Sequence, residues 1–231
     1  MRAKIKEFGE ISRFRQHLFP LLFLVVGTVI IYTSSLRGSF HFDDLQVKDR
    51  PNLHVSELSL DSLKSTFLWT PNSKKIYRPL PCLTLGLNYY FGKTDTFGYH
   101  LVNIAVHVLC AFAVYIFLHA LLSIPGIRPD FAVKHRHEVA VVAAFLFAFH
   151  PIQTNVVSYV IQRMTSMAAL FYIVSVTAYI FFRKETLSHE SPSNIKKHSS
   201  LFIAIVSGLF AFSSKENAAF LPIMVFFIDR L

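Results

Sequence analysis

The sequence has few charged residues and almost no cysteine. Asp, Glu, Lys and Arg make up 16% of the 231 residues, whereas hydrophobic residues make up 53%. Soluble domains carry about 25% charged residues, so this composition excludes an ordinary cytosolic domain. Two cysteines, Cys82 and Cys110, are too few for a disulfide framework. The low share of charged residues and the high share of hydrophobic ones predict an integral membrane protein.

Several motifs of soluble enzymes are also missing. The sequence contains no internal repeat, no low-complexity tract, no glycine-rich phosphate loop and no HExxH zinc motif. No cofactor is therefore predicted, and no residue pattern indicates a divalent metal. The net charge of +9 could suggest a nucleic-acid partner. The Lys and Arg residues instead flank apolar runs, so we expect a lipid bilayer and no nucleic acid.

What the sequence does contain is a series of apolar runs. The first covers residues 18–36, and about 20 apolar residues are enough to span a bilayer. Further runs cover residues 98–124, 139–150, 158–182, 199–212 and 218–229. The last two are separated by "SSKEN", which fits either a turn between two short spans or a break within one helix; we favour two spans. The runs predict an all-α membrane protein with about six transmembrane helices.

The polar segments between the runs predict the topology. Residues 1–17, 125–138 and 183–198 carry five, three and four Lys or Arg residues, a higher density than the eight in residues 37–97. Lys and Arg are enriched in cytoplasmic segments. We therefore expect a cytoplasmic tail at 1–17 and an outer loop at 37–97 that faces the periplasm or the lumen.

The outer loop contains two half-apolar stretches, residues 58–69 and 78–92, which are too short or too mixed to span a bilayer. Such stretches are typical of helices that lie at the membrane interface. The whole chain, 1–231, is then predicted to form a single transmembrane module, with no repeat domain.

Two adjacent carboxylates, Asp43 and Asp44, follow the first apolar run in "SFHFDDLQ". Adjacent like charges near a low-dielectric membrane resist ionisation, and a poorly solvated carboxylate can act as a general base toward a hydroxyl. The alternative is a solvated acidic loop. Because the pair lies only a few residues past the end of a span, we treat both residues as candidate catalytic bases.

Ionisable residues near the ends of later runs extend the candidate site. Lys215 and Glu216 lie between the last two runs. An ionisable residue at membrane depth indicates a functional role. The alternative is a turn at the headgroup level in which both side chains are solvated. Arg163 opens the run 158–182, and the planar fork of an arginine suits a phosphate. Arg78 in "YRPL" and His150 in "FHP" are further candidate substrate ligands, although for His150 we favour slightly the alternative of a helix-ending residue bonded to a backbone carbonyl. None is predicted to bind a metal.

Motifs in a fixed order resemble a known family. The chain reads "FDD", "RPL", "LNYYFG", "YHLVNIAVHVL", "FAFHPIQTNVVSYVIQRMTSMAALFYIVS" and "SKENAAFLP". From about residue 37 onward it resembles the membrane half of the transmembrane and tetratricopeptide-repeat O-mannosyltransferase-like proteins, in the GT-C glycosyltransferase superfamily. The resemblance implies a polyprenyl- or dolichyl-phosphate sugar donor and an active site on the non-cytoplasmic face of the bacterial inner membrane or endoplasmic reticulum.

The resemblance also implies residue roles. Asp43 and Asp44 match the two carboxylates of the family's first outer loop. The remaining matches are Arg78 to the family's "RP", His150 to its "HP", and Lys215 and Glu216 to its "KE". Family members often have Glu at the position of Asn155 and an acidic residue near Thr165 and Ser166. They are also longer and usually carry repeats.

Two functions from different classes compete at this point. The first is inverting transfer of a mannose-like hexose to a hydroxyl of an acceptor protein or glycan. Asp43 or Asp44 then takes the proton, and Arg163, Arg78 or Lys215 holds the leaving phosphate. The second is a non-catalytic, truncated or partner-dependent membrane subunit or scaffold that keeps the fold. A transporter ranks last, because most charges here lie at span ends instead of the membrane midplane.

Overall fold

The computed structural model describes residues 2–124, 130–187 and 194–230, with their side chains except at 2–16 and 132. Within these residues the regular secondary structure is helical, apart from one isolated β-bridge between Leu68 and Ile76, and turns and loops connect the helices. The α-helices are α1 (Arg2–Tyr32), α2 (Leu45–Asp49), α3 (Leu60–Ser65), α4 (Pro79–Gly92), α5 (Thr96–Leu121), α6 (Asp130–Lys134), α7 (Arg136–Phe149), α8 (Thr154–Ser158), α9 (Arg163–Leu187), α10 (Asn194–Phe212) and α11 (Leu221–Arg230). The short 3-10 helices are η1 (Thr33–Arg37), η2 (Phe42–Asp44), η3 (Pro51–Leu53), η4 (Pro151–Gln153), η5 (Val160–Gln162) and η6 (Glu216–Phe220).

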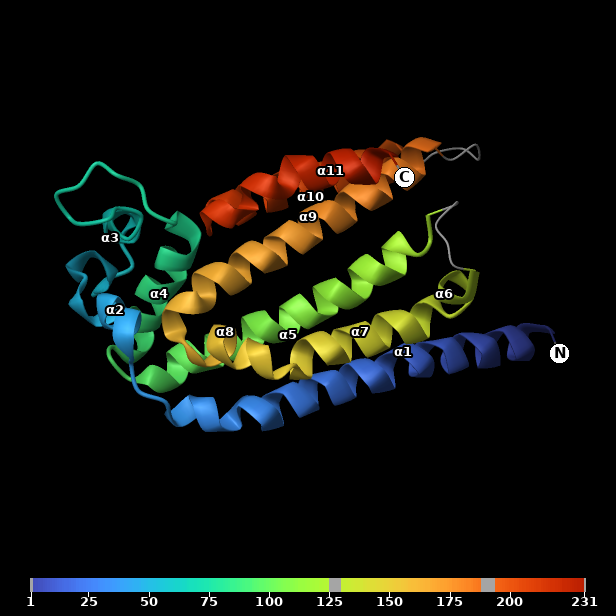
Figure 1. Cartoon of the computed structure of the whole chain (residues 1–231), viewed down its shortest axis with the longest axis horizontal. Helices are drawn as coiled ribbons and strands as arrows, with labels where there is room; N and C mark the ends of the chain where they lie inside the picture. Colours follow the sequence, from blue (N-terminus) through green and yellow to red (C-terminus); the bar gives the residue numbers. More distant parts are fainter. Residues whose placement is uncertain (1, 125–129, 188–193, 231) are drawn as a thin grey trace.

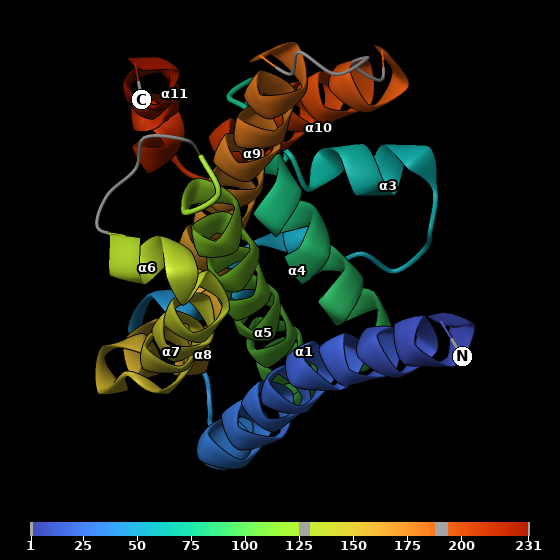
Figure 2. The same cartoon turned by 90° about the vertical axis from the view of Figure 1, so that its right-hand side faces the viewer.

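The long helices form a bundle, and α2, α3 and α4 cover one of its ends (Figure 1). We call this end the loop end. Helices α1, α7 and α10 run toward the loop end, whereas α5, α9 and α11 run away from it. Seen along the bundle, α5 occupies the centre, between α1 and α7 on one side and α9 and α10 on the other (Figure 2). The chain therefore returns to the loop end after each pair of long helices.

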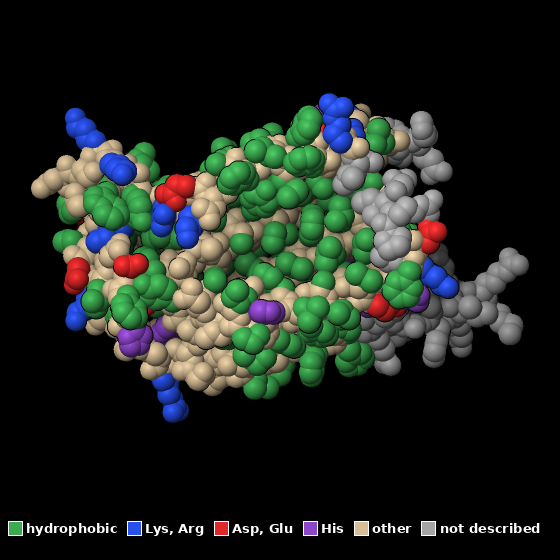
Figure 3. Space-filling view, viewed as in Figure 1, with side chains coloured by type: hydrophobic (Ala, Val, Ile, Leu, Met, Phe, Trp, Pro, Cys, Tyr) green, Lys and Arg blue, Asp and Glu red, His purple; other side chains and the backbone are tan. Residues whose placement is uncertain are grey.

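The distribution of side chains is that of a membrane protein. Hydrophobic side chains cover the length of the bundle, and Lys, Arg, Asp and Glu gather at its two ends (Figure 3). Within the described residues, four helices are long and apolar enough to cross a membrane: His17–Arg37, Thr96–Leu121, Val160–Leu187 and Asn194–Phe212. A fifth crossing results if the pair Arg136–Phe149 and Pro151–Ser158, bent by 49°, counts as one. An all-α integral membrane fold is confirmed, whereas the predicted number of six spans is not.

Local sequence explains where the helices of the loop segment begin. The Ser59 hydroxyl accepts a hydrogen bond from the N–H of Ser62 and caps α3. Pro79 occupies the first turn of α4, where its missing N–H costs nothing. The Asp95 carboxylate accepts the N–H of Phe97 at 3.0 Å and caps α5. A helix thus forms within each half-apolar stretch, and the location of these helices at the membrane interface stays a prediction.

Small residues and polar bridges hold the long helices together. Ala140, Ala144 and Ala148 repeat every four residues along α7 and are buried, which lets this helix lie close to its neighbours. His107 on α5 bonds the Ala148 carbonyl at 3.0 Å, and the Ser175 hydroxyl on α9 donates to the Ala204 carbonyl on α10 at 2.7 Å. These two hydrogen bonds join polar side chains to backbone carbonyls of neighbouring helices within an otherwise apolar bundle.

Residues 199–229 form two antiparallel helices, not one broken helix. Helix α10 already begins at Asn194 and ends at Phe212, and the chain then turns back through η6 into α11 (Figure 1). The returning helix packs on α9, where Asp229 pairs with Arg183 at 3.0 Å and accepts the Tyr179 hydroxyl at 2.6 Å. Helix α11 has ten residues, about 15 Å of helix, which is half of a bilayer core.

Candidate functional site

The candidate residues come from five separate segments that all reach the loop end of the bundle. They are supplied by η2, the start of α4, the end of α7, the start of α9 and the turn before η6. This convergence follows from the alternating direction of the long helices. Within that end the residues divide into a buried group, Asp44 and Arg163, and an exposed group, in which Glu216 is exposed and Arg78 and Lys215 are half-buried.

The two adjacent carboxylates face different environments. Asp44 is 1% exposed, and its carboxylate accepts the backbone N–H groups of Ile161 at 2.7 Å and Val160 at 3.3 Å. Asp43 is exposed, and its own N–H donates to the Tyr159 hydroxyl at 2.8 Å. The loop before α2 is thereby attached to the segment that leads into α9. Asp44 makes the attachment, and Asp43 keeps an accessible carboxylate.

Burial raises the pKa of the Asp44 carboxyl, and hydrogen bonds from three backbone N–H groups, those of Ile161, His41 and Val160, act in the opposite direction. Phe42, just before the pair, has φ 47°, a left-handed conformation that is costly for a bulky residue. Such strain persists only where surrounding contacts over-determine the backbone. The contacts of Asp43 and Asp44 with the segment before α9 provide that constraint.

Arg163 is the largest fully buried side chain among the described residues, with 0% exposure. Each of its three guanidinium nitrogens donates to a neutral oxygen. The acceptors are Asn103 Oδ1 at 2.8 Å, Asn88 Oδ1 at 2.6 Å, Thr84 Oγ1 at 3.2 Å and the Tyr99 carbonyl at 2.9 Å. The sequence predicted this arginine at the start of a span, where it lies, but its fork is occupied by protein oxygens instead of facing an open phosphate site.

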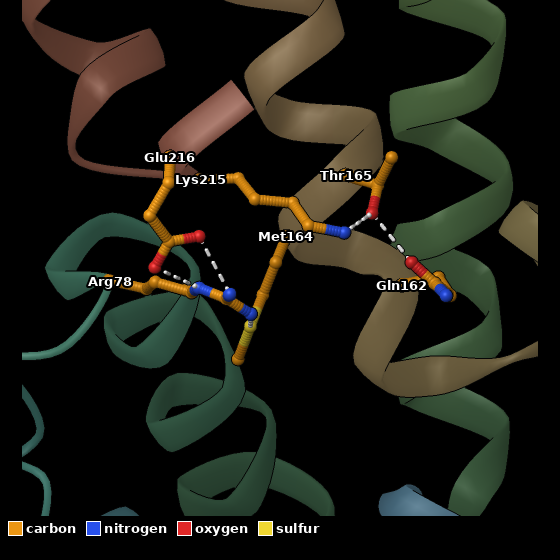
Figure 4. Close-up of polar contacts among 6 residues, drawn as sticks. All are labelled: Arg78, Gln162, Met164, Thr165, Lys215 and Glu216. Atoms are coloured by element: carbon orange, nitrogen blue, oxygen red, sulfur yellow. Dashed lines mark hydrogen bonds and ion pairs between the residues drawn. The ribbon is translucent and has the colours of Figure 1, made fainter. Parts of the chain in front are cut away.

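Arg78 and Glu216 form the centre of the exposed group (Figure 4). The carboxylate accepts Arg78 Nε at 3.2 Å and Nη2 at 2.7 Å, in a two-point pair. The third nitrogen, Nη1, contacts Met164 Sδ at 3.1 Å, and the guanidinium lies over the Tyr77 ring. Arg78 itself has φ 41°, so this position also stores backbone strain. All three nitrogens of Arg78 are therefore engaged.

Lys215 points away from the Arg78–Glu216 pair although it precedes Glu216 in the chain (Figure 4). Its backbone is extended, with φ −161° and ψ 149°, so successive side chains leave on opposite sides. The ammonium donates to Thr165 Oγ1 at 2.7 Å, and this hydroxyl bonds Gln162 Oε1. Among the described residues, no carboxylate lies within ion-pair distance of Lys215.

The electrostatics of the exposed group are coupled. Burial, and after it the positive charge of Arg78, lowers the pKa of Lys215, whereas Glu216 acts to raise it. The hydrogen bond from Arg78 holds the pKa of Glu216 below its usual range. A cavity of about 270 Å³ adjoins Lys215 between α9 and the first residues of η6. Its walls are Thr165, Ala168, Ala169, Tyr172, Ile173, Lys215, Asn217 and Ala218.

His150 remains apart from both groups. It is exposed at the bend between α7 and η4, and its Nδ1 accepts the N–H of Ile152 at 3.2 Å. The sequence left open a bond to a backbone carbonyl as the alternative to substrate contact, and the observed partner is a backbone N–H instead. Among the described side chains, no group of three or more His, Cys, Asp or Glu residues could hold a metal ion.

Three residues of the site were missed by the sequence reasoning: Tyr159, Asn103 and Thr165. Asn103 carried a usable signal, because it is an uncharged polar residue within an apolar run and needs a partner at membrane depth. Tyr159 and Thr165 carried none, since their roles arise from contacts with Asp43 and Lys215 across more than 40 residues of sequence. Only the packed structure could reveal them.

The fold and the site define a helical integral membrane protein with a polar site at one end of its bundle. Comparison with known proteins adds the family. Over 211 residues, 84% of this chain, it is 32% identical to Protein O-mannosyl-transferase TMTC4 of Mus musculus, of which it covers 27%. Over 162 residues, 68% of this chain, it is 31% identical to Protein O-mannosyl-transferase TMTC3 of Homo sapiens, of which it covers 16%.

A protein O-mannosyl-transferase of Caenorhabditis elegans is 30% identical over 170 residues, which are 71% of this chain and 23% of that protein. These matches confirm the resemblance to the transmembrane and tetratricopeptide-repeat O-mannosyltransferase family that the motifs indicated. The chain spans about a quarter or less of the length of these relatives. No protein-family model and no solved structure matches it.

Proposed function

We propose that this chain is the membrane module of a glycosyltransferase that moves a mannose-like hexose from a polyprenyl-phosphate donor to a hydroxyl group of a protein acceptor. The names of the relatives support the transfer of mannose to protein. The single observation that carries the proposal is the pairing of an exposed Asp43 with a buried Asp44, which anchors it at the end where Arg78, Lys215 and Glu216 meet.

Asp43 is the base of the proposed reaction. Its exposed carboxylate takes the proton of the acceptor hydroxyl while the hydroxyl oxygen attacks the anomeric carbon. The bond between that carbon and the phosphate oxygen breaks, and the lipid phosphate leaves with the electron pair. Attack from the side opposite the leaving group inverts the anomeric centre. Tyr159 positions the base through its contact with the Asp43 backbone.

Lys215 is the proposed partner of the leaving phosphate. Its ammonium adjoins the cavity beside α9 and has no carboxylate partner among the described residues. A positioned cation stabilises the charge that develops on a leaving phosphate. Arg163 and Asp44 have a different part in the proposal, because both are enclosed: they fix the start of α9 and the loop that carries Asp43.

The decisive experiment compares two carboxylates of one loop. In the chain reconstituted in nanodiscs, Asp43→Asn should lower the rate of transfer from a prenyl-phosphoryl mannose by about 10²- to 10⁴-fold, the loss typical of a general base. Asp49→Asn, which changes an exposed carboxylate on α2, is the matched control and should transfer normally. Full activity of the Asp43→Asn variant would remove Asp43 from the mechanism.

The proposed face of the membrane has its own test. We propose that the loop end faces the periplasm or lumen, with the bent α7–α8 pair and the η6–α11 segment as the short crossings of a six-span topology. Asn72→Cys lies on the loop segment and Thr186→Cys near the opposite end of α9, and both positions are exposed. The native Cys82 and Cys110 are buried. An impermeant thiol reagent should label the first variant from outside and not the second; the reverse labelling would invert the topology.

A further inference from the structure

Three histidines meet at the end of the bundle opposite the loop end, which we call the far end and which faces the viewer in Figure 2. They are His17 on α1, His119 on α5 and His137 on α7. Their ring centroids lie 6.4, 6.1 and 6.0 Å from the ring centroid of Tyr115. The rings of His17 and His137 are 4.3 Å apart. We call these three histidines and Tyr115 the histidine cluster.

The Tyr115 hydroxyl holds two of the histidines by their Nδ1 atoms. Its oxygen lies 2.6 Å from His17 Nδ1 and 3.1 Å from His137 Nδ1. The hydroxyl can donate to only one ring, but its oxygen can accept N–H bonds from both, so both rings can be protonated without losing these contacts. The Nε2 atom of His17 lies on the side of its ring away from the hydroxyl. No hydrogen bond from another described residue occupies the nitrogens of His119. The cluster therefore keeps nitrogens that can meet a ligand.

The charges around His119 are all those of basic side chains. Among the described residues, the groups that act on it are Arg136 and His137 of α7, His17 of α1 and Lys184 of α9. Arg136 and Lys184 are exposed, and the three histidines are partly buried. Bases held close together disfavour one another's charged forms, and an anion placed among them reverses this effect. Four helices thus present basic groups to a common region.

We infer that the histidine cluster, together with Arg136 and Lys184, binds a terminal phosphate group, that is, a phosphate that is free or bonded through one oxygen only. Donors that come from four helices approach from several directions. The oxygens of a terminal phosphate accept hydrogen bonds from several directions, whereas a carboxylate offers two oxygens in one plane. The described side chains form no group that could hold a metal ion. This site is separate from the loop end and does not depend on the proposed reaction.

The depth of the site suits a phosphate carried by a lipid headgroup as well as a free phosphate. His17 opens the candidate span His17–Arg37, His119 lies near the end of Thr96–Leu121, and Lys184 lies near the end of Val160–Leu187. The far ends of three spans therefore place these side chains at the headgroup level. Basic pockets between membrane helices on the cytoplasmic side bind phosphate-bearing headgroups, and in the proposed topology the far end faces the cytoplasm.

The test has two arms, one for each source of the phosphate. The first measures binding of radiolabelled inorganic phosphate to the chain in phosphatidylcholine nanodiscs. The second uses native mass spectrometry to compare retention of phosphatidic acid, which has a terminal phosphate, with retention of phosphatidylglycerol, whose phosphate is bonded through two oxygens. His119→Gln and Arg136→Gln should each weaken phosphate binding or retention of phosphatidic acid by about tenfold, because each removes one charge-assisted hydrogen bond. His119→Lys should keep most of it.

His135→Gln is the matched control, because this histidine lies at the same end but beside Glu138, at 4.0 Å. It should bind like the wild type. Binding of inorganic phosphate that His119→Gln weakens would identify a free phosphate, and preferred retention of phosphatidic acid that the same variant loses would identify a headgroup. Arg136 is exposed, so a loss in Arg136→Gln does not come from unfolding. The inference is overturned if neither probe binds, if phosphatidic acid and phosphatidylglycerol are retained equally and no phosphate binds, or if neither substitution weakens the binding. Binding that depends on Lys215 instead would place the phosphate at the loop end and also overturn it.

Discussion

Two groups of polar residues lie at the same end of this bundle and use the same residue types in opposite ways. In the buried group, Asp44 and Arg163 have 1% and 0% exposure and bond to neutral protein groups. In the exposed group, Arg78 and Glu216 bond to each other, and Lys215 faces a cavity. The first turn of α9 joins the groups, because Arg163 points inward while Met164 and Thr165 contact Arg78 and Lys215.

The difference shows what burial does to an ionisable residue. A buried charge must find hydrogen-bond partners in the protein, and once they are found it serves structure and is costly to remove. An exposed charge contributes little to stability but stays available to a ligand. We therefore expect Arg163 and Asp44 to serve stability, whereas the proposed function gives ligand chemistry to Asp43 and Lys215. Three further predictions test this division.

The largest effect on stability is expected at Arg163. Arg163→Ala leaves the buried Asn103 Oδ1 without the arginine donor, at a cost of about 1–3 kcal/mol, and empties the volume of a fully buried side chain, at a cost of about 2–5 kcal/mol, so at least ~3 kcal/mol should be lost. Arg163→Lys should recover only part of it, because one nitrogen cannot reproduce a three-nitrogen fork. Unfolding in detergent measures both variants. Arg78→Ala is the control, expected within about 1 kcal/mol of wild type. Equal losses for Arg163→Ala and Arg78→Ala would end the distinction between the groups.

A smaller loss of stability is expected at Asp44. Asp44→Asn replaces one acceptor oxygen with an amide that faces backbone donors, either Ile161 or Val160, at a cost of about 1–3 kcal/mol. The neighbouring Asp43→Asn removes no acceptor from a buried donor and should unfold like the wild type. Thermal unfolding of the two variants compares directly how much each of these adjacent carboxylates contributes to stability. A stable Asp44→Asn variant would place Asp44 back among the candidate bases.

The smallest effect concerns the pH dependence of the exposed pair. Arg78 lowers the pKa of Glu216, so the pair is present at neutral pH and is lost only as the pH falls through this lowered pKa. Arg78→Gln should raise the pKa of Glu216 toward its usual range, and the carboxylate should then protonate at higher pH. NMR titration of ¹³C-labelled glutamate measures the change. Arg183→Gln, in the distant pair, should leave the Glu216 titration where it is in wild type; an unchanged titration in Arg78→Gln would contradict the pairing.

Much of the molecule was predictable from the sequence, for physical reasons that act locally. Apolar runs near the length needed to span a bilayer predicted α1, α5, α9 and α10. A segment in lipid must form a helix because only then are the hydrogen bonds of its backbone made within the segment itself. Helices α3 and α4 of the loop segment lie within the half-apolar stretches that predicted them. The return of distant motifs to one end followed from the number of crossings between them. The short runs were harder to interpret: α7 reaches span length only with its bent continuation, and α11 has ten residues.

The sequence by itself determined that the chain is a helical membrane protein, which ionisable residues lie near span ends, and which family it resembles, because composition, run length and motif order are properties of the chain. Only the tertiary structure decided which of those residues are enclosed. Asp43 and Asp44 are neighbours with the same side chain, and Arg78 and Arg163 have the same fork, yet one member of each pair is buried. Solvation depends on what packs around a side chain in space, from Asn103 on α5 to the backbone before α9, and no local pattern records it.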